Sequence, residues 1–114
     1  MVHMILRLRT GAAGAAEVSR ALRTVMLPAQ RDRACLRAQL HADINDPDAL
    51  CYSEEWLTVE DVIREIRSTR FNRLLELMET ASEPPELLFR FISETRGLEY
   101  VAEVRGTQAP ATTN

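Results

Sequence analysis

Two consecutive strand-like segments joined by a turn constrain the fold of this chain more than any other feature. In residues 33–43 apolar and polar side chains alternate, with the period that is typical of a half-buried strand. Residues 49–57 are a second strand-like segment, and the INDPDA sequence between the two carries the Asn, Asp and Pro that favour a turn. The pattern predicts a β-hairpin, so the sheet to which it belongs is antiparallel here.

The segments before and after this hairpin predict a further strand and two helices. Alternation over residues 2–9 predicts a strand, and apolar residues at helical spacing over residues 15–30 predict a helix. Pro28 is expected to end or kink this helix near its last turn. After the hairpin, Thr58 and Asp61 form a capping-box pattern at the start of a second helix, which a short break near the STR sequence divides.

A last strand and an ambiguous segment follow the second helix. The EPPE sequence stops the helix, and LLFRFIS is apolar on nearly both faces, which favours a covered strand. Residues 97–105 fit either a short helix or a strand, and residues 106–114 have the composition of a disordered tail. We therefore predict one domain over residues 1–105, with an α+β, ferredoxin-like βαββαβ fold, an antiparallel sheet and helices on one face.

Length, composition and charge exclude several classes of protein. The 114 residues suffice for one domain, and 46% hydrophobic with 27% charged residues is an ordinary globular balance. The net charge of -3 gives no indication of nucleic-acid binding. No apolar run approaches the roughly 20 residues that a membrane span needs. Because the N-terminus also lacks the features of a signal peptide, we expect a cytoplasmic protein that binds neither nucleic acid nor a membrane.

The cysteine and histidine positions do not indicate a metal site. Cys35 and Cys51 form no zinc pattern. If the hairpin register sets Cys51 opposite His41, Cys35 lies roughly 20 Å away at about 3.3 Å per residue, which is too far for a disulfide. His3 and His41 have no third ligand at a suitable spacing. We therefore expect two free thiols, no bound metal and no cofactor.

Strand parity assigns the hairpin side chains to two faces of the sheet, because neighbouring residues in a strand point to opposite sides. Glu54 falls with Tyr52 and Trp56 on the side covered by helices, whereas Glu55 faces the open side. The open side also carries the polar residues Arg37, Gln39 and His41, together with His3, Ile5, Arg7 and Ser53. This side is either a solvated face or the interface of a homodimer, in which Arg37 and Glu55 of two copies pair.

Three segments, in this order, resemble the antibiotic biosynthesis monooxygenase domain family: MILRLRTG, the late-helix proline followed by RACLRAQLHAD, and CYSEEWLTVEDVIREIRSTRFNRLL. The match covers about residues 2–93, and the E-x-W strand end, the capped helix and the RSxxF spacing are its most specific part. The resemblance implies a subunit that dimerises sheet to sheet into an α+β barrel, with a small pocket between sheet and helices. Members include cofactor-free oxygenases of quinols and aromatic polyketides, haem-degrading enzymes, and proteins of no known activity.

Several residues depart from the pattern of that family. Many members have a histidine in the second helix where this chain has Glu65, and Arg70 occupies a position that often holds another histidine. Glu65 and Leu75 stand where the haem-degrading branch has its Trp and His, so haem degradation is not expected. The asparagine of the polyketide oxygenases corresponds to Tyr52, and only Trp56 matches cleanly.

Two functions remain open at this point. In the first, the chain is a cofactor-independent monooxygenase of a small quinol or phenolic aromatic, with Glu54, Trp56 and Tyr52 as catalytic residues. Burial would then raise the proton affinity of Glu54 and let it act as the base. In the second, the chain is a non-catalytic dimeric ligand-binding or scaffold protein. Glu54 is then a structural acceptor for Trp56, Tyr52 or a helix N-terminus. The missing histidines favour the second function.

Overall fold

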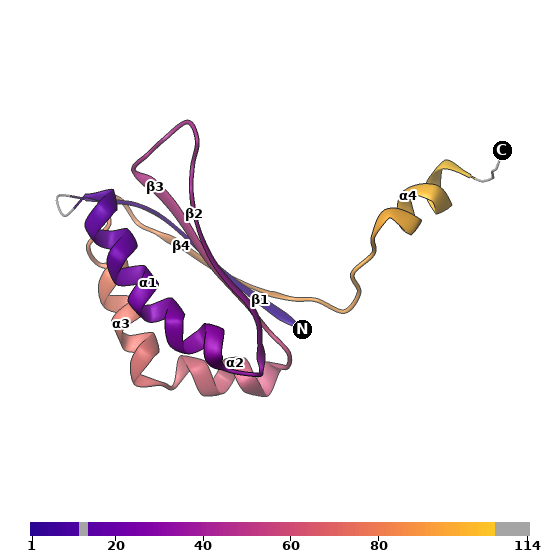
Figure 1. Cartoon of the computed structure of the whole chain (residues 1–114), viewed down its shortest axis with the longest axis horizontal. Helices are drawn as coiled ribbons and strands as arrows, with labels where there is room; N and C mark the ends of the chain where they lie inside the picture. Colours follow the sequence, from indigo (N-terminus) through magenta and orange to yellow (C-terminus); the bar gives the residue numbers. More distant parts are fainter. Residues whose placement is uncertain (12–13, 107–114) are drawn as a thin grey trace.

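The computed structural model describes residues 1–11 and 14–106, which form four strands and four helices. Figure 1 shows them in chain order. The elements are β1 (Val2–Arg9), α1 (Ala15–Arg31), β2 (Cys35–Ala42), β3 (Ala49–Trp56), α2 (Val59–Ile66), α3 (Thr69–Met78), β4 (Glu86–Phe91) and α4 (Leu98–Arg105). The tail predicted for residues 106–114 lies, apart from Gly106, outside the described residues.

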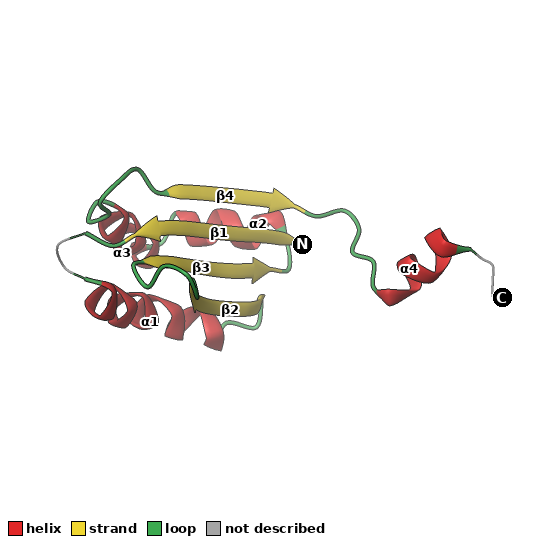
Figure 2. Cartoon of the chain, turned by 90° about the horizontal axis from the view of Figure 1, so that it is seen from above, coloured by secondary structure: helices red, strands yellow, loops and turns green. Residues whose placement is uncertain are grey.

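The four strands form one antiparallel sheet in the order β2-β3-β1-β4. Helices α1, α2 and α3 all lie on the same side of it, as Figures 1 and 2 show from two directions. This is the ferredoxin-like α+β arrangement that the order of elements predicts, and the prediction is confirmed. The dimeric barrel stays a prediction, because a single chain does not test it.

The core lies between the sheet and these three helices. Alternate residues of β1 and β3 are buried, and Leu22 of α1 and Leu74 of α3 pack against them. A second buried cluster gathers around Trp56 at the end of β3, with Val2 and Val62. The two clusters together cover the helix side of the sheet, so Tyr52, Glu54 and Trp56 are all inside the fold.

Local signals in the sequence explain where the helices begin and end. The side chain of Thr58 accepts a hydrogen bond from Asp61 N (3.2 Å), and the Asp61 carboxylate accepts one from Thr58 N (3.2 Å), which confirms the predicted capping box. The predicted break lies at Arg67 and Ser68, and Ser68 caps α3. Helix α1 ends at Arg31, one residue beyond the prediction.

One predicted face in β2 is wrong. The alternation in residues 33–43 places Leu36 on the helix side with Ala38 and Leu40, but the pairing register shifts between Cys35 and Arg37, and Leu36 is 50% exposed. A bulge inserts an extra residue and reverses the sides of the residues before it. Beyond the bulge the expected register holds: His41 lies opposite Cys51, and both cysteines are free.

The segment that the sequence left open, residues 97–105, is the helix α4. It projects from the body of the molecule beyond the end of β4 (Figures 1 and 2). Within the described ranges, no helix is both long and apolar enough to cross a membrane.

Candidate functional site

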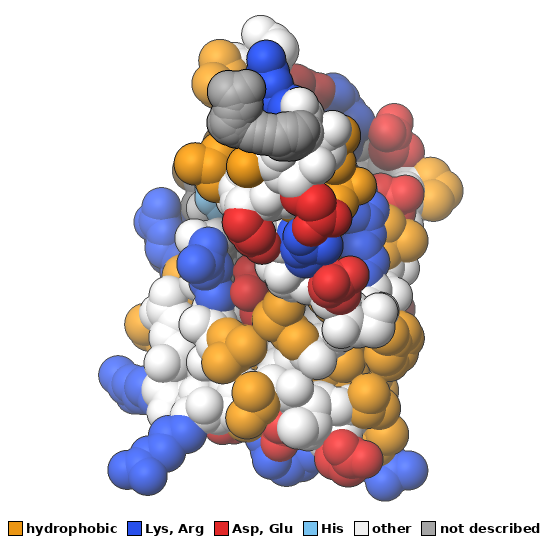
Figure 3. All heavy atoms as spheres, turned by 90° about the vertical axis from the view of Figure 1, so that its right-hand side faces the viewer, with side chains coloured by type: hydrophobic (Ala, Val, Ile, Leu, Met, Phe, Trp, Pro, Cys, Tyr) orange, Lys and Arg blue, Asp and Glu red, His pale blue; other side chains and the backbone are white. Residues whose placement is uncertain are grey.

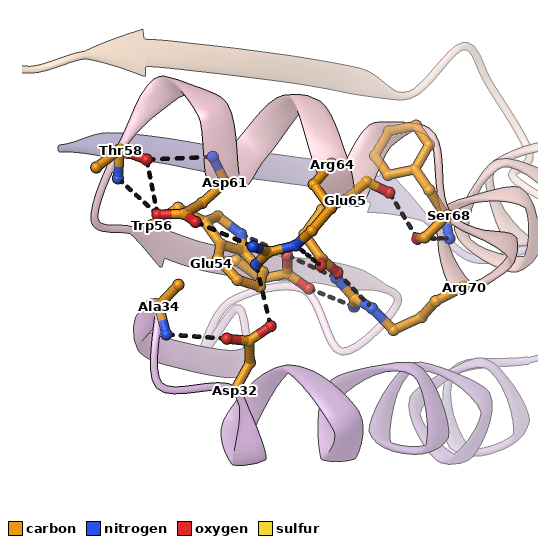
Figure 4. A network of polar contacts seen from close by, with 11 residues as sticks. Asp32, Ala34, Glu54, Trp56, Thr58, Asp61, Arg64, Glu65, Ser68 and Arg70 are labelled. Carbon is orange, nitrogen blue, oxygen red and sulfur yellow. Dashed lines mark hydrogen bonds and ion pairs between the residues drawn. The ribbon is translucent and has the colours of Figure 1, made fainter.

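Glu54 lies two residues before the end of β3 and is 1% exposed, although it carries a carboxylate. It accepts hydrogen bonds from the Tyr52 hydroxyl and from Trp56 Nε1, the latter at 2.9 Å. The three residues alternate along one strand, so their side chains share its helix side. The structure therefore brings together the three residues that strand parity places together, and Figure 4 shows Glu54 beside Trp56.

Arg70, at the start of α3, is the main partner of Glu54. Its Nη1 donates to one carboxylate oxygen at 2.7 Å and its Nη2 donates to the other at 3.2 Å, which is the two-pronged geometry of a strong ion pair. Arg70 also donates to Glu65 from Nη2 (2.7 Å) and Nε (3.2 Å), and to the Val25 carbonyl from Nη1 (3.1 Å). These five bonds equal the number of N–H groups in a guanidinium.

The acceptor positions of the Glu54 carboxylate and the N–H donors of the Arg70 guanidinium are thus all occupied. A carboxylate has about four acceptor positions, and Glu54 receives bonds from the Tyr52 hydroxyl, Trp56 Nε1 and two nitrogens of Arg70. Through Arg70 the network joins β3 to α1, α2 and α3. Neither the carboxylate of Glu54 nor the guanidinium of Arg70 has hydrogen-bonding capacity left for a ligand.

The surroundings also shift two pKa values. Burial raises the pKa of the Tyr52 hydroxyl, and the charge of Glu54 and the hydrogen bond to it raise it further. Burial lowers the pKa of Arg70, but the hydrogen bonds and charges of Glu54 and Glu65 outweigh it, and the net shift is upward. Both shifts favour the protonated donor, so Tyr52 and Arg70 keep donating to Glu54 at ordinary pH.

A more exposed layer continues the network outward. Arg64 of α2 contacts Asp61 at 3.1 Å, Glu65 at 3.6 Å and Asp32, at the end of α1, at 3.2 Å. Asp32 in turn accepts from Ala34 N at 2.9 Å. Figure 4 shows Arg64 between Asp61 and Asp32, so that this layer ties the end of α1 to α2. Because Arg64 is half-exposed, these pairs add little stability.

Two cavities lie between α1 and α3, next to the network. The smaller, about 210 Å³, is lined by Thr24, Val25, Pro28, Thr69, Arg70 and Arg73. The larger, about 430 Å³, is lined by Ala21, Thr24, Val25, Arg73, Glu76, Leu77 and Thr80. Neither is lined by Tyr52, Glu54 or Trp56, and Arg70 lines the smaller one, so a ligand in the smaller cavity would meet the network at Arg70.

Sequence reasoning treated Arg70 and Glu65 as departures from a family pattern and missed that Arg70 pairs with both Glu54 and Glu65. A signal was available in the helix spacing. Arg70 precedes Leu74 by four residues and Leu77 by seven, which puts it on the same inward face of α3. A buried carboxylate in the facing strand requires a cation, and Arg70 is the inward cation of that helix.

The open side of the sheet carries the predicted dimer-interface residues. Arg37 lies opposite Glu55 in the register, Gln39 opposite Ser53, and His41 opposite Cys51. This confirms which side chains share the face, and the dimer itself stays a prediction. Ile5, in the middle of this face, is only 6% exposed and lies opposite Ser53 in β3 and Leu88 in β4.

Cys35 lies beside the network, at the start of β2. Burial raises the pKa of its thiol to about 11, and the charge of Glu54 adds to the shift. A thiol with such a pKa is almost entirely protonated near neutral pH, and the thiolate is the reactive form. Cys35 is therefore not a nucleophile of this site. In the described parts of the chain, no cluster of three or more His, Cys, Asp or Glu side chains is arranged to hold a metal ion.

The fold has clear structural counterparts, although sequence comparison does not identify them. No protein-family model matches the chain, and no curated protein matches it in sequence. Its fold is that of the solved antibiotic biosynthesis monooxygenase proteins.

Three of these structures illustrate the likeness. A candidate antibiotic biosynthesis monooxygenase of Deinococcus radiodurans superposes with a TM-score of 0.75 at 14% identity, over 85% of this chain and 97% of that one. An antibiotic biosynthesis monooxygenase gives 0.70 at 17% identity, over 82% and 100%. SnoaB, a cofactor-independent oxygenase of Streptomyces nogalater, was solved as a single-site mutant and gives 0.70 at 13% identity, over 82% and 94%. At such identities the likeness concerns the fold.

Proposed function

We propose that this chain is a homodimeric binding or scaffold protein with the fold of the antibiotic biosynthesis monooxygenases, in which Glu54 has a structural role. The observation that carries the proposal is the saturated network. Glu54 accepts four hydrogen bonds and Arg70 donates five, all of them within the chain. A general base needs a free lone pair within reach of the substrate proton, and Glu54 offers none.

A second candidate function is the cofactor-independent oxidation of a small quinol or phenol by O2. The cavity of about 210 Å³ that Arg70 lines favours it, because an acidic phenol bound there would lie one side chain away from Glu54. The names of the structural neighbours point the same way. In this function Arg70 would have to turn toward the ligand and release Glu54, which would then take the phenolic proton with Tyr52 and Trp56 beside it.

Oxygen uptake separates the two functions. With a panel of menadiol-like quinols and anthrones, the proposal predicts uptake at the rate of spontaneous oxidation for both the wild-type protein and Glu54→Gln. The matched control is Glu55→Gln, which makes the same change one residue away on the other face. Uptake well above that rate would establish the oxygenase, and a roughly 100-fold loss in Glu54→Gln at a temperature where this variant is still folded, with Glu55→Gln unaffected, would refute the structural proposal.

The homodimer is proposed to form through the open side of the sheet. Its polar rows support this, since Arg37 and Glu55 are adjacent within one subunit and a two-fold axis presents each of them to a second copy of the pair. A solvated face is the alternative. The proposed assembly would have about twice the 12.9 kDa mass of the subunit.

Charge reversal at Arg37 tests this interface. We expect Arg37→Glu to raise the dimer dissociation constant at least tenfold, because it places an acid next to Glu55 and like charges at an interface repel. Arg20→Glu, on the exposed side of α1, is the control and should change it less than about threefold. Sedimentation equilibrium at micromolar concentrations measures both. A wild-type monomer, or equal effects of the two variants, would contradict the sheet-to-sheet dimer.

A further inference from the structure

The two cavities between α1 and α3 form one continuous groove, which we call the α1–α3 groove. These helices lie side by side on the helix side of the sheet (Figure 1). The cavities share Thr24, Val25 and Arg73 as lining residues, and their other walls come from the same two helices and the turn after α3. No residue of the described strands lines either cavity. The groove is therefore separate from the space between the sheet and the helices.

The smaller cavity is the cationic end of the groove, lined by both Arg70 and Arg73. Arg70 is neutralised by Glu54 and Glu65, each at 2.7 Å. Arg73 is exposed and forms no ion pair within residues 1–11 and 14–106. The hydroxyl of Thr69, which lines the same cavity, has no hydrogen-bond partner in those ranges either. This end therefore offers an unpaired guanidinium and an unused hydroxyl to a ligand.

The charge at this end favours a carboxylate as the group that binds there. A guanidinium donates two parallel N–H groups to the two oxygens of a carboxylate, in charge-assisted hydrogen bonds. Helix α1 adds to the positive potential, because the charged residues after its first turn are all arginines: Arg20, Arg23 and Arg31. A positive potential raises the local concentration of anions, so this end of the groove discriminates against amines.

The larger cavity, of about 430 Å³, is the apolar end of the groove. Ala21, Val25 and Leu77 form an aliphatic wall, and none of the residues that line the cavity is aromatic. Its volume lies within the range of about 300–1,000 Å³ that is typical of small-molecule sites. The seven-residue step from Arg73 to Thr80 spans roughly 10 Å at 1.5 Å per residue, about the length of an extended eight-carbon chain. This end suits an aliphatic chain better than a stacked aromatic ring.

Glu76 sets the direction in which such a ligand binds. It lines the larger cavity three residues after Arg73 and carries the opposite charge. Since like charges repel, the carboxylate of the ligand lies at the Arg73 end and its chain extends past Leu77. A dicarboxylate of the same length would bring its second charge close to Glu76. The groove therefore selects monocarboxylates.

We propose that the α1–α3 groove binds a medium-chain aliphatic monocarboxylate, whose carboxylate is held by Arg73 and Thr69. Its chain packs against the aliphatic wall of the larger cavity. The inference rests on the binding function proposed above and names the class of ligand. Because Arg73 is not part of the ion pairs that join the helices to the sheet, the ligand can bind and leave while the fold stays intact.

Three probes with the same eight-carbon chain test the head group: octanoate, octan-1-ol and suberate, which has a carboxylate at both ends. Heteronuclear NMR titration of the full chain measures both affinity and location. We expect octanoate to bind with a Kd below about 1 mM and to shift the resonances of the residues that line the groove. Octan-1-ol and suberate should bind at least tenfold more weakly. Octan-1-ol binding as tightly as octanoate would overturn the carboxylate site.

Two variants test the position of the ligand. Arg73→Met should raise the Kd of octanoate at least tenfold and that of octan-1-ol less than about twofold, because it removes only the charged contact. The matched control is Arg67→Met, the same change at an exposed position outside both cavities, which should change either constant less than about twofold. Ala21→Leu fills the apolar end and should weaken both probes. Equal effects of the two arginine variants, or unchanged binding in Ala21→Leu, would overturn the groove as the site.

Other exposed apolar side chains provide the alternative location: Leu57, Val59, Ile63 and Phe91. Figure 3 shows hydrophobic side chains among charged ones at the surface of one end of the molecule. Resonance shifts confined to those four residues would show binding to exposed apolar surface and overturn the groove site. Absence of octanoate binding at about 10 mM, ten times the expected Kd, overturns it too. That result leaves the structural role of Glu54 in place, because oxygen uptake tests that role separately.

Discussion

Replacing Arg70 with methionine is expected to destabilise the fold by about 3–5 kcal/mol, the cost of removing one partner from a buried ion pair. The carboxylate of Glu54 would stay 1% exposed and lose two of its four hydrogen bonds, both of them to a positive charge. Glu65 and the Val25 carbonyl would lose their bonds to Arg70 as well. Methionine keeps much of the volume, so a cavity adds little to the loss.

Urea or thermal unfolding measures this effect. For a domain of this size a loss of 3 kcal/mol lowers the melting temperature by roughly 12 °C or more. Arg73→Met is the matched control, because it makes the same change three residues further along α3 at an exposed position, and we expect it to stay within about 0.5 kcal/mol of the wild type. A similar small effect of Arg70→Met would mean that the ion pair with Glu54 is not part of what stabilises the fold.

The second large effect is expected at Glu54 itself. Glu54→Gln keeps the shape of the side chain but replaces one acceptor oxygen by an amide that donates. That amide faces donors on every side, namely the Tyr52 hydroxyl, Trp56 Nε1 and Arg70. We expect a loss of about 2–4 kcal/mol, since at least one buried donor is left without an acceptor and Arg70 loses a counter-charge.

The neighbouring acid provides the control for this variant. Glu55 lies on the open face, and Glu55→Gln should change the free energy of unfolding of the monomer by less than about 0.5 kcal/mol. When both variants are measured in the same urea series, the difference between their free energies of unfolding gives the contribution of the burial of Glu54 and of its hydrogen-bond partners. If Glu54→Gln unfolds at the same denaturant concentration as Glu55→Gln, Glu54 does not contribute to the free energy of unfolding, and its role is not structural.

Strand parity explains why half of this site could be predicted from the sequence. Tyr52, Glu54 and Trp56 alternate in one strand, and the capping box after Trp56 fixes where the strand ends, so their common side follows from backbone geometry alone. The same rule failed at Leu36, because a bulge adds one residue to a strand without leaving a clear trace in an alternating pattern.

The other half of the site depends on tertiary contacts that no local pattern encodes. The pairing of Glu54 with Arg70 joins residues 16 positions apart, in different elements. Comparison with a family pattern directed attention to the histidines that this chain lacks, whereas the physical question was which cation neutralises a buried carboxylate. The helical form of α4 was equally out of reach, since the composition of this segment fits a helix or a strand.

The structural role that we propose for Glu54 also explains the departures at Glu65 and Arg70 together. The two residues bond to each other at 2.7 Å, and together with Glu54 they place two negative charges around one positive charge between the sheet and the helices. This arrangement occupies the region where the family resemblance implies a pocket. A chain built in this way keeps the fold of the solved antibiotic biosynthesis monooxygenase structures and places a hydrogen-bonded ion-pair network between the sheet and the helices.

A double-mutant cycle between Glu54→Gln and Arg70→Met tests the central claim, that these two side chains form a structural unit, most directly. Free energies of unfolding of the wild type, both single variants and the double variant give the coupling between the two residues. We predict a coupling of about 2–3 kcal/mol, because once one partner is gone the loss of the other costs little more. Additive effects, with a coupling below about 0.5 kcal/mol, would contradict the structural account and return Glu54 to the list of candidate bases.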